Sequence, residues 1–275
     1  MTDFVLASEL SAAERAELFT AAYEDYVVPF ALDEERLLFL ESAFGNDLEA
    51  SLVAVADGAR IGLANLARND TDGCGTDGWV AGVGVVKAHR GRGIGEALMH
   101  GLHDAARGLE LERIWLEVIE ENVAARRLYE KLGYEHVRQL EVWTLPEIVA
   151  PSNYLLPARA TLAEANAWIR EHRREREPWQ RSDATLARLQ ELEPEPEAIA
   201  VYGGAAVVRV AGGRVSVVQI AATGESVYRE LFERAAKLGT PVSLMNLPAG
   251  DPAGAALSSL GGRVDIRQHE MVLEL

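Results

Sequence analysis

The sequence has few of the residues on which several classes of protein depend. Its 275 residues include one cysteine, Cys74, which excludes an intramolecular disulfide framework and a cysteine-based zinc site. The six histidines show neither an H-x-x-x-H spacing nor a cysteine partner, so we expect no bound metal. No apolar run approaches the ~20 residues of a membrane-spanning helix, and the first residues lack the pattern of a secretory signal. These absences predict a cytoplasmic protein without a membrane anchor.

Positive charge is also scarce. The chain has 27 Lys and Arg, only three of them lysine, against 43 Asp and Glu, which gives a net charge of −16. The preference for arginine is typical of a GC-rich bacterial genome. Residues 1–150 hold 27 acids and 13 bases, so −14 of the net charge lies there. This charge argues against nucleic acid and anionic membranes as partners. It suits a cationic partner such as an amine, or serves solubility alone.

Helix and strand signals alternate along the first half. Ser11 is a predicted helix N-cap with Glu14 three residues on, and Asp57-Gly58 predicts a hairpin turn. We expect helices over residues 12–27, 32–45, 93–109 and 122–133, two strands within 48–69, and further strands over 79–86, 113–119 and 136–145. The strand over 79–86 is continuously apolar, which predicts burial on both faces.

A similar order recurs after a linker over residues 145–159, which contains three prolines. We expect helices over 161–174, 184–192, 224–239 and 252–262, three strands within 199–221, and strands over 242–247 and 265–275. Residues 137–142 also align with residues 266–271, so we interpret the chain as a diverged internal duplication. A run of charges over residues 170–181 is interpreted as a solvated face.

The most informative segment is a glycine-rich turn between the strand over 79–86 and the helix over 93–109. Glycines let a backbone turn tightly with its N–H groups uncovered, and a helix N-terminus adds partial positive charge. Together they predict a phosphate or pyrophosphate site. The order fits neither a dinucleotide fingerprint nor a P-loop. It fits the pattern Arg90-x-x-Gly93-x-Gly95 after an apolar strand.

In this pattern the sequence resembles the GNAT superfamily of acyl-CoA-dependent N-acyltransferases. A second family segment follows on the next strand and helix, with Asn122, Ala125, Tyr129, Gly133 and Tyr134 in the expected order. The resemblance covers roughly residues 1–145. For the rest of the chain only the order of elements is similar.

The resemblance implies an α/β chain of two GNAT-like domains, each a mixed, largely antiparallel sheet flanked by helices. We expect residues 1–148 to form an acetyltransferase domain that binds acetyl-CoA, and residues 149–275 to form a degenerate copy. By resemblance the pantetheine arm pairs with Val85 and Val86, and the CoA site includes Asn122 and Ala125. The pyrophosphate is expected on the backbone amides of Arg90, Gly91, Arg92, Gly93, Ile94 and Gly95.

Two residues are candidates for catalysis. Tyr129 matches the family tyrosine near the CoA sulfur, where it can act as general acid, although an aromatic residue on such a helix also packs in a core. Glu117 lies on an otherwise apolar strand, where an isolated carboxylate is costly to bury. It is either the general base, directly or through water, or part of a structural ion pair. Glu120, Glu121 and Asp77 are weaker candidates for the base, and an N–H near Val85 is the expected oxyanion donor.

The acceptor pocket is expected at the first two helices and the link between them. Tyr23, Tyr26 and Phe30 lie beside acidic residues there, a combination that can hold a cationic amine or simply pack. Trp79 is a further candidate wall.

In the second half only Gly224 remains of the glycine-rich turn, and the position of Tyr129 corresponds to about Leu257. We therefore expect no CoA site there. The resulting hypothesis is an acetyl-CoA-dependent N-acetyltransferase that acts on a primary amine by direct transfer in a ternary complex, as a monomer or homodimer. The alternative is a non-catalytic acyl-CoA-binding or regulatory module.

Overall fold

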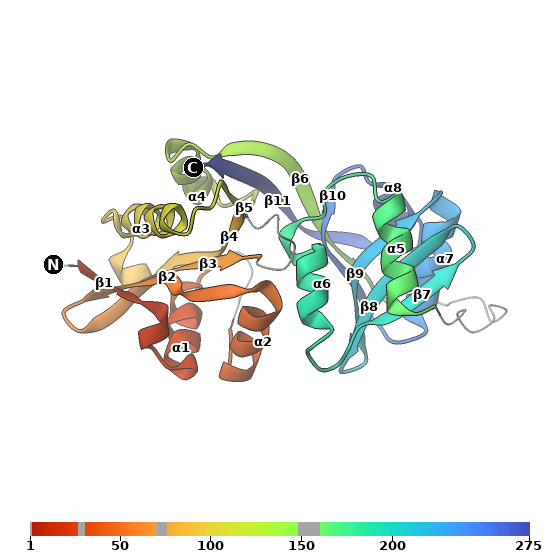
Figure 1. The fold of residues 1–275 in the computed structure, drawn as a ribbon, viewed down its shortest axis with the longest axis horizontal. Helices are drawn as coiled ribbons and strands as arrows, with labels where there is room; N and C mark the ends of the chain where they lie inside the picture. Colours follow the sequence, from red (N-terminus) through yellow and green to blue (C-terminus); the bar gives the residue numbers. More distant parts are fainter. Residues whose placement is uncertain (1, 27–30, 70–75, 148–159) are drawn as a thin grey trace. The chain divides into compact units, whose positions relative to one another are not determined.

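In the computed structural model the chain forms two units, one of residues 1–137 with 270–275 and the other of residues 138–269. The structure describes residues 2–26, 31–69, 76–147 and 160–275. Both units are mixed sheets with helices, which confirms the predicted α/β class (Figure 1).

The first unit is built on a sheet in the order β1-β2-β3-β4-β5. The first four strands are antiparallel neighbours, and β5 runs parallel to β4. Its helices α1 and α2 lie on one side of this sheet, and α3 and α4 lie on the other (Figure 1). The elements are β1 (Thr2–Leu6), η1 (Ala7–Glu9), α1 (Ala12–Ala22), α2 (Glu34–Phe44), β2 (Asn46–Ala56), β3 (Ala59–Arg68), β4 (Asp77–Val85), η2 (Lys87–His89), α3 (Ile94–Gly108), β5 (Arg113–Ile119) and α4 (Val123–Lys131).

Local signals fix several of these boundaries. The Ser11 hydroxyl accepts from the Glu14 N–H, and the Glu14 carboxylate accepts from the Ser11 N–H, so α1 begins at the predicted capping box. Asp57 and Gly58 both have positive φ and join β2 to β3, which confirms the predicted hairpin. The strand β1 was not predicted.

The second unit repeats part of this plan, with strands in the order β6-β10-β9-β8-β7. Strands β7, β8 and β9 are antiparallel neighbours, β10 runs parallel to β9, and β6 pairs antiparallel with β10. The elements are β6 (Glu135–Leu145), α5 (Leu162–His172), η3 (Trp179–Arg181), α6 (Asp183–Leu189), β7 (Glu197–Val201), β8 (Gly204–Ala211), β9 (Arg214–Ala222), α7 (Glu225–Ala236), β10 (Val242–Pro248), α8 (Pro252–Ser259) and β11 (Arg263–Glu274).

The final strand is divided between the units, because residues 270–275 belong to the first. Met271 is part of the core cluster that contains Tyr129 and Tyr134, and the Leu275 N–H donates to the Glu112 carbonyl at 2.9 Å. The far end of the chain therefore completes the core around α4.

Candidate active site

Strands β4 and β5 pair at one end and separate at the other. They are paired from Asp77 with Arg113 to Trp79 with Trp115, after which β4 continues to pair with β3 as far as Val85. Gly78 to Val80 are buried, but the residues from Ala81 to Val85 are only half-buried. The prediction that this strand is buried on both faces was therefore wrong for its second half, since its pairing with β5 ends at Trp79.

Side chains from α1 and the turn occupy two carbonyls of this separated edge. The Tyr23 hydroxyl donates to the Val83 carbonyl at 3.0 Å, and Arg90 Nε donates to the Val85 carbonyl at 2.8 Å. The Val86 N–H donates to Ile61 on the β3 side. A strand residue directs its N–H and its C=O to the same side of the strand. The N–H groups of Val83 and Val85 therefore face the gap between the separated parts of β4 and β5.

Close packing of Tyr23 depends on two glycines in β4. A Cβ at Gly82 would lie 3.3 Å from the Tyr23 hydroxyl, and a Cβ at Gly84 would lie 3.0 Å from the Tyr23 ring. Tyr23 also stacks on Phe19 with ring centroids 4.4 Å apart. The Tyr23 ring is thus packed against β4.

The glycine-rich turn exposes the N-terminus of α3. Gly91 and Gly93 have φ of 74° and 80°, where other residues are strained, and a Cβ at either would contact nothing within 4 Å. Gly93 is the N-cap and supplies no side chain to satisfy the first N–H groups of the helix. The carboxylate of Glu96 in this turn is held by Lys131 at 2.6 Å, which lowers the pKa of Glu96.

The two arginines of the turn have different surroundings. Arg90 donates to the Ala22 carbonyl and forms an ion pair with Asp25 at 2.7 Å, so it fastens the turn to the end of α1. This pairing lowers the pKa of Asp25. Arg92 is exposed and donates to the Ala88 carbonyl.

Tyr129 lies in α4 among other phenols. Its side chain is 6% exposed. Burial, and then the neighbouring Tyr23, Tyr134 and Tyr26, raise its pKa well above the usual value. Its hydroxyl makes no hydrogen bond with any residue that the structure describes. Asn122 caps α4 by accepting from the Ala125 N–H at 3.2 Å, so both residues help to position this helix.

Glu117 and Trp79 are joined across the two strands. The Trp79 indole N–H donates to Glu117 Oε2 at 2.7 Å. On β5, Ile114, Leu116 and Val118 pack in the core with α3, so alternation turns Glu117 to the opposite face. The sequence identified both residues, but Glu117 was predicted as a candidate base and Trp79 as a wall of the acceptor pocket, with no contact between them.

Asp77, a weaker candidate for the base, is engaged at the paired end of these strands. Its carboxylate accepts from Arg113 at 2.7 Å and from the Trp115 indole at 3.0 Å. Tyr26 is half-buried, which raises its pKa, and it bonds to Asn122. Phe30 lies outside the described residues.

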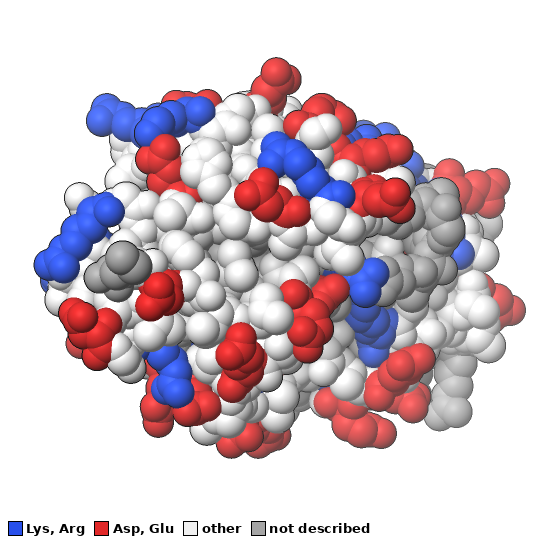
Figure 2. Space-filling model, turned by 60° about the vertical axis from the view of Figure 1, so that its left-hand side comes forward, with Lys and Arg blue, Asp and Glu red and all other residues white. Residues whose placement is uncertain are grey.

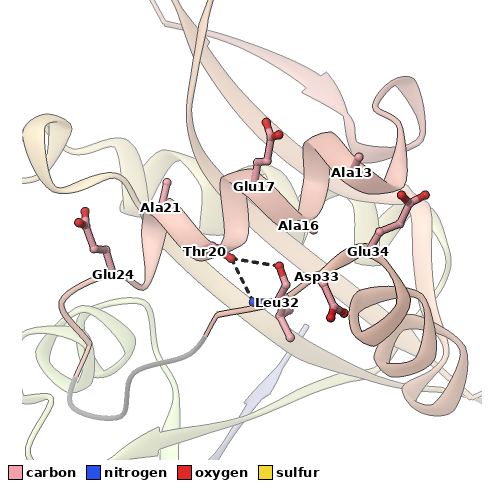
Figure 3. A pocket seen from close by; sticks show the side chains of 9 residues that line it. All are labelled: Ala13, Ala16, Glu17, Thr20, Ala21, Glu24, Leu32, Asp33 and Glu34. Carbon is pink, nitrogen blue, oxygen red and sulfur yellow. Dashed lines mark hydrogen bonds between the residues drawn. The ribbon is translucent and has the colours of Figure 1, made fainter.

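A groove between α1 and the start of α2 was not predicted in detail (Figure 3). Its volume is about 600 Å³, and Thr20 ties its walls together through bonds to the Leu32 backbone. Four carboxylates line it: Glu17, Glu24, Asp33 and Glu34. Acidic side chains are also spread widely over the face of the molecule in Figure 2.

The equivalent strands of the second unit also separate. Strands β9 and β10 pair only from Val215 with Val242 to Val217 with Leu244. Gly224, at the N-terminus of α7, has extended backbone rather than the positive φ of Gly93.

The described residues contain neither a metal site nor a membrane-spanning helix. Within residues 2–26, 31–69, 76–147 and 160–275, no group of three or more His, Cys, Asp or Glu could hold a metal ion. No helix in these ranges is long and apolar enough to cross a membrane.

Comparisons with known proteins agree with this geometry. The model of the acetyltransferase (GNAT) family matches residues 15–134. A GCN5-related N-acetyltransferase from Sphaerobacter thermophilus superposes with a TM-score of 0.73 at 18% identity, covering 100% of this chain and 95% of that one. A tandem GNAT protein from the clavulanic acid biosynthesis pathway gives 0.66 at 15%, covering 100% and 98%. A GCN5-related N-acetyltransferase from Kribbella flavida gives 0.59 at 17%, covering 100% and 71%. No curated protein matches the sequence.

Proposed function

We propose, on the match of residues 15–134 to the model of the acetyltransferase (GNAT) family, that the chain is an acetyl-CoA-dependent N-acetyltransferase. It transfers the acetyl group directly to a primary amine while both substrates are bound. The observation that carries this proposal is the separation of β4 from β5 beside an open helix N-terminus, with Tyr129 and Glu117 on the flanking elements.

The residues present fit acetyl-CoA as a substrate. The uncapped N–H groups at the start of α3 suit the pyrophosphate, and the Lys131 ammonium neutralises Glu96, the acidic residue of that first turn. Arg90 holds the turn in place, and the exposed Arg92 adds positive charge. The N–H groups of Val83 and Val85 suit the pantetheine arm, which would lie against β4 as an added strand.

The transfer needs a proton to leave the amine and a proton to reach the sulfur. Once the ammonium form has released one proton to water, the neutral amine nitrogen attacks the thioester carbon and the C–S bond breaks. Glu117, directly or through water, accepts the proton from nitrogen, and the Val85 N–H stabilises the oxyanion. Tyr129 donates to the departing sulfur. Burial raises the pKa of this phenol and so keeps it protonated, as a proton donor must be before the transfer.

A cationic acceptor is supported by the groove between α1 and α2. Its four carboxylates attract an ammonium group. Tyr26 and Trp79 would form the apolar part of the acceptor site.

The test is release of free thiol from acetyl-CoA across a panel of primary amines, with CoA affinity measured by calorimetry. Tyr129→Phe should lower kcat by about 10²-fold or more and leave CoA affinity nearly unchanged. Tyr134→Phe is the matched control, because this buried phenol is bonded to His103 instead. Tight CoA binding without turnover of any amine would favour the non-catalytic binding module.

A further inference from the structure

In the second unit, the gap between β9 and β10 is filled by the chain itself. The helix η3 contacts both strands. Gln219 on β9 donates to the Arg181 carbonyl at 2.7 Å, and Asn246 on β10 donates to the Gln180 side chain at 2.9 Å. Residues 180–183 therefore occupy the gap between β9 and β10, which corresponds to the gap between β4 and β5 in the first unit.

This filling segment carries a buried charge. Arg181 is 3% exposed and Glu177 is 8% exposed, so the prediction that residues 170–181 form a solvated face was wrong at these two positions. Arg181 Nη2 forms an ion pair with Glu177 at 3.1 Å. Its Nε and Nη1 are buried and have no hydrogen-bond partner among the residues that the structure describes.

Arg181 is among the residues that line a small cavity of about 20 Å³. The cavity is lined by Arg173, Arg174 and Arg176 as well as Arg181, and Arg174 and Arg176 are exposed, so it lies close to the surface. We propose that the second unit binds a small monovalent anion here, a halide ion or one oxygen of a carboxylate, on Arg181 Nε and Nη1.

Size and charge together select this class of ligand. A cavity of this volume takes about one water-sized group, which excludes a whole phosphate or nucleotide. An arginine does not lose its proton, so its buried N–H groups need acceptors, and an anion binds them more strongly than water does.

The acids around the cavity do not meet this need. Asp251 accepts from the Ala253 N–H as the cap of α8, and Glu175 is paired with Arg138. Glu177 faces only Nη2 of Arg181. Burial raises the pKa of Glu177, while the neighbouring guanidinium groups of Arg181 and Arg173 act in the opposite direction.

The direct test is anomalous diffraction from crystals of the full chain soaked in sodium bromide. We expect a bromide peak within hydrogen-bond distance of Arg181 Nε or Nη1. If the site prefers a carboxylate, acetate should displace this bromide by competition. If the site prefers a halide, chloride should displace it instead. An ordered water alone at this position, with bromide bound elsewhere on the same molecule, would overturn the proposal.

A solution test uses the double variant Glu177→Leu/Arg181→Met. Replacing a buried ion pair by apolar residues of similar volume often preserves folding. Bound chloride multiplies the ratio of folded to unfolded protein by 1 + [Cl⁻]/Kd. At constant ionic strength, replacing sulfate by chloride, or in a second series sulfate by acetate, should raise Tm of the unmodified chain and of the control Arg229→Gln, an exposed arginine of α7, relative to that of the double variant with at least one of the two anions. An equal rise in all three would contradict a specific site.

Discussion

Replacing Trp79 by phenylalanine tests whether Glu117 is the general base. Trp79 occupies the last paired position of β4 and β5, and its indole N–H donates to Glu117 at 2.7 Å. Phenylalanine keeps an aromatic ring against Phe44, whose ring centroid lies 5.6 Å from that of Trp79. The substitution therefore removes the donor while it retains most of the packing.

The expected effect follows from the energy of a hydrogen bond to a charged group, about 1.5–3 kcal/mol. Losing it destabilises the carboxylate form of Glu117 and so raises the pKa of this group. A base must be unprotonated to accept a proton, so the acidic limb of kcat/KM moves to higher pH. On the acidic side of the profile, kcat/KM of the variant should be about 10- to 100-fold lower than that of the unmodified chain, and the plateau at high pH should be retained.

The assay is thiol release from acetyl-CoA as a function of pH, with thermal unfolding to confirm folding. Trp115→Phe is the matched control. Trp115 is the residue paired with Trp79 across the two strands, and its indole N–H donates to Asp77 rather than to Glu117. This variant should leave the limb unmoved. A folded Trp79→Phe variant whose limb coincides with that of the unmodified enzyme would refute the assignment of Glu117.

Three further predictions concern the turn and the core. Gly93→Ala strains a position with φ of 80° and should weaken CoA binding by about tenfold or more, whereas Gly95→Ala, whose Cβ would meet its nearest neighbour at 3.8 Å, should bind normally in calorimetry. Burial lowers the pKa of His103 to about 4 from 6.5. As the pH drops from 6.5 to 4, this histidine takes up a proton in the unfolded chain but not in the folded one, so the free energy of unfolding falls by up to about 3 kcal/mol. Denaturant titrations of His103→Gln should lack this part of the pH dependence. Met271→Ala should destabilise the first unit by about 2–5 kcal/mol in the same titrations, and an unchanged midpoint would show that the end of the chain is not needed there.

Local patterns were sufficient for much of the first unit. The capping box at Ser11, the hairpin at Asp57-Gly58 and the glycine-rich turn depend on neighbours in sequence, so propensity and turn chemistry identify them. The short strand β1 lacked such a signal, because its pattern of mixed residues shows no clear alternation.

Long-range pairing could not be predicted in this way. The hydrogen bond between Trp79 and Glu117 depends on the register of two strands that are parallel and separated by a helix. The burial of Arg181 depends on η3 filling the gap between β9 and β10, whereas charge composition alone favours exposure. Each miss comes from tertiary contacts that outweigh local preference.

The placement of residues 270–275 in the first unit has a consequence for the synthesis and evolution of the chain. A ribosome releases the first half early, but Met271 reaches the core beside Tyr129 only after more than a hundred further residues, on the order of ten seconds later. The first unit must wait for the second unit to be made. For the same reason a deletion that trimmed the gene after the first 137 codons would discard part of the first unit, so the two units are not simply separable.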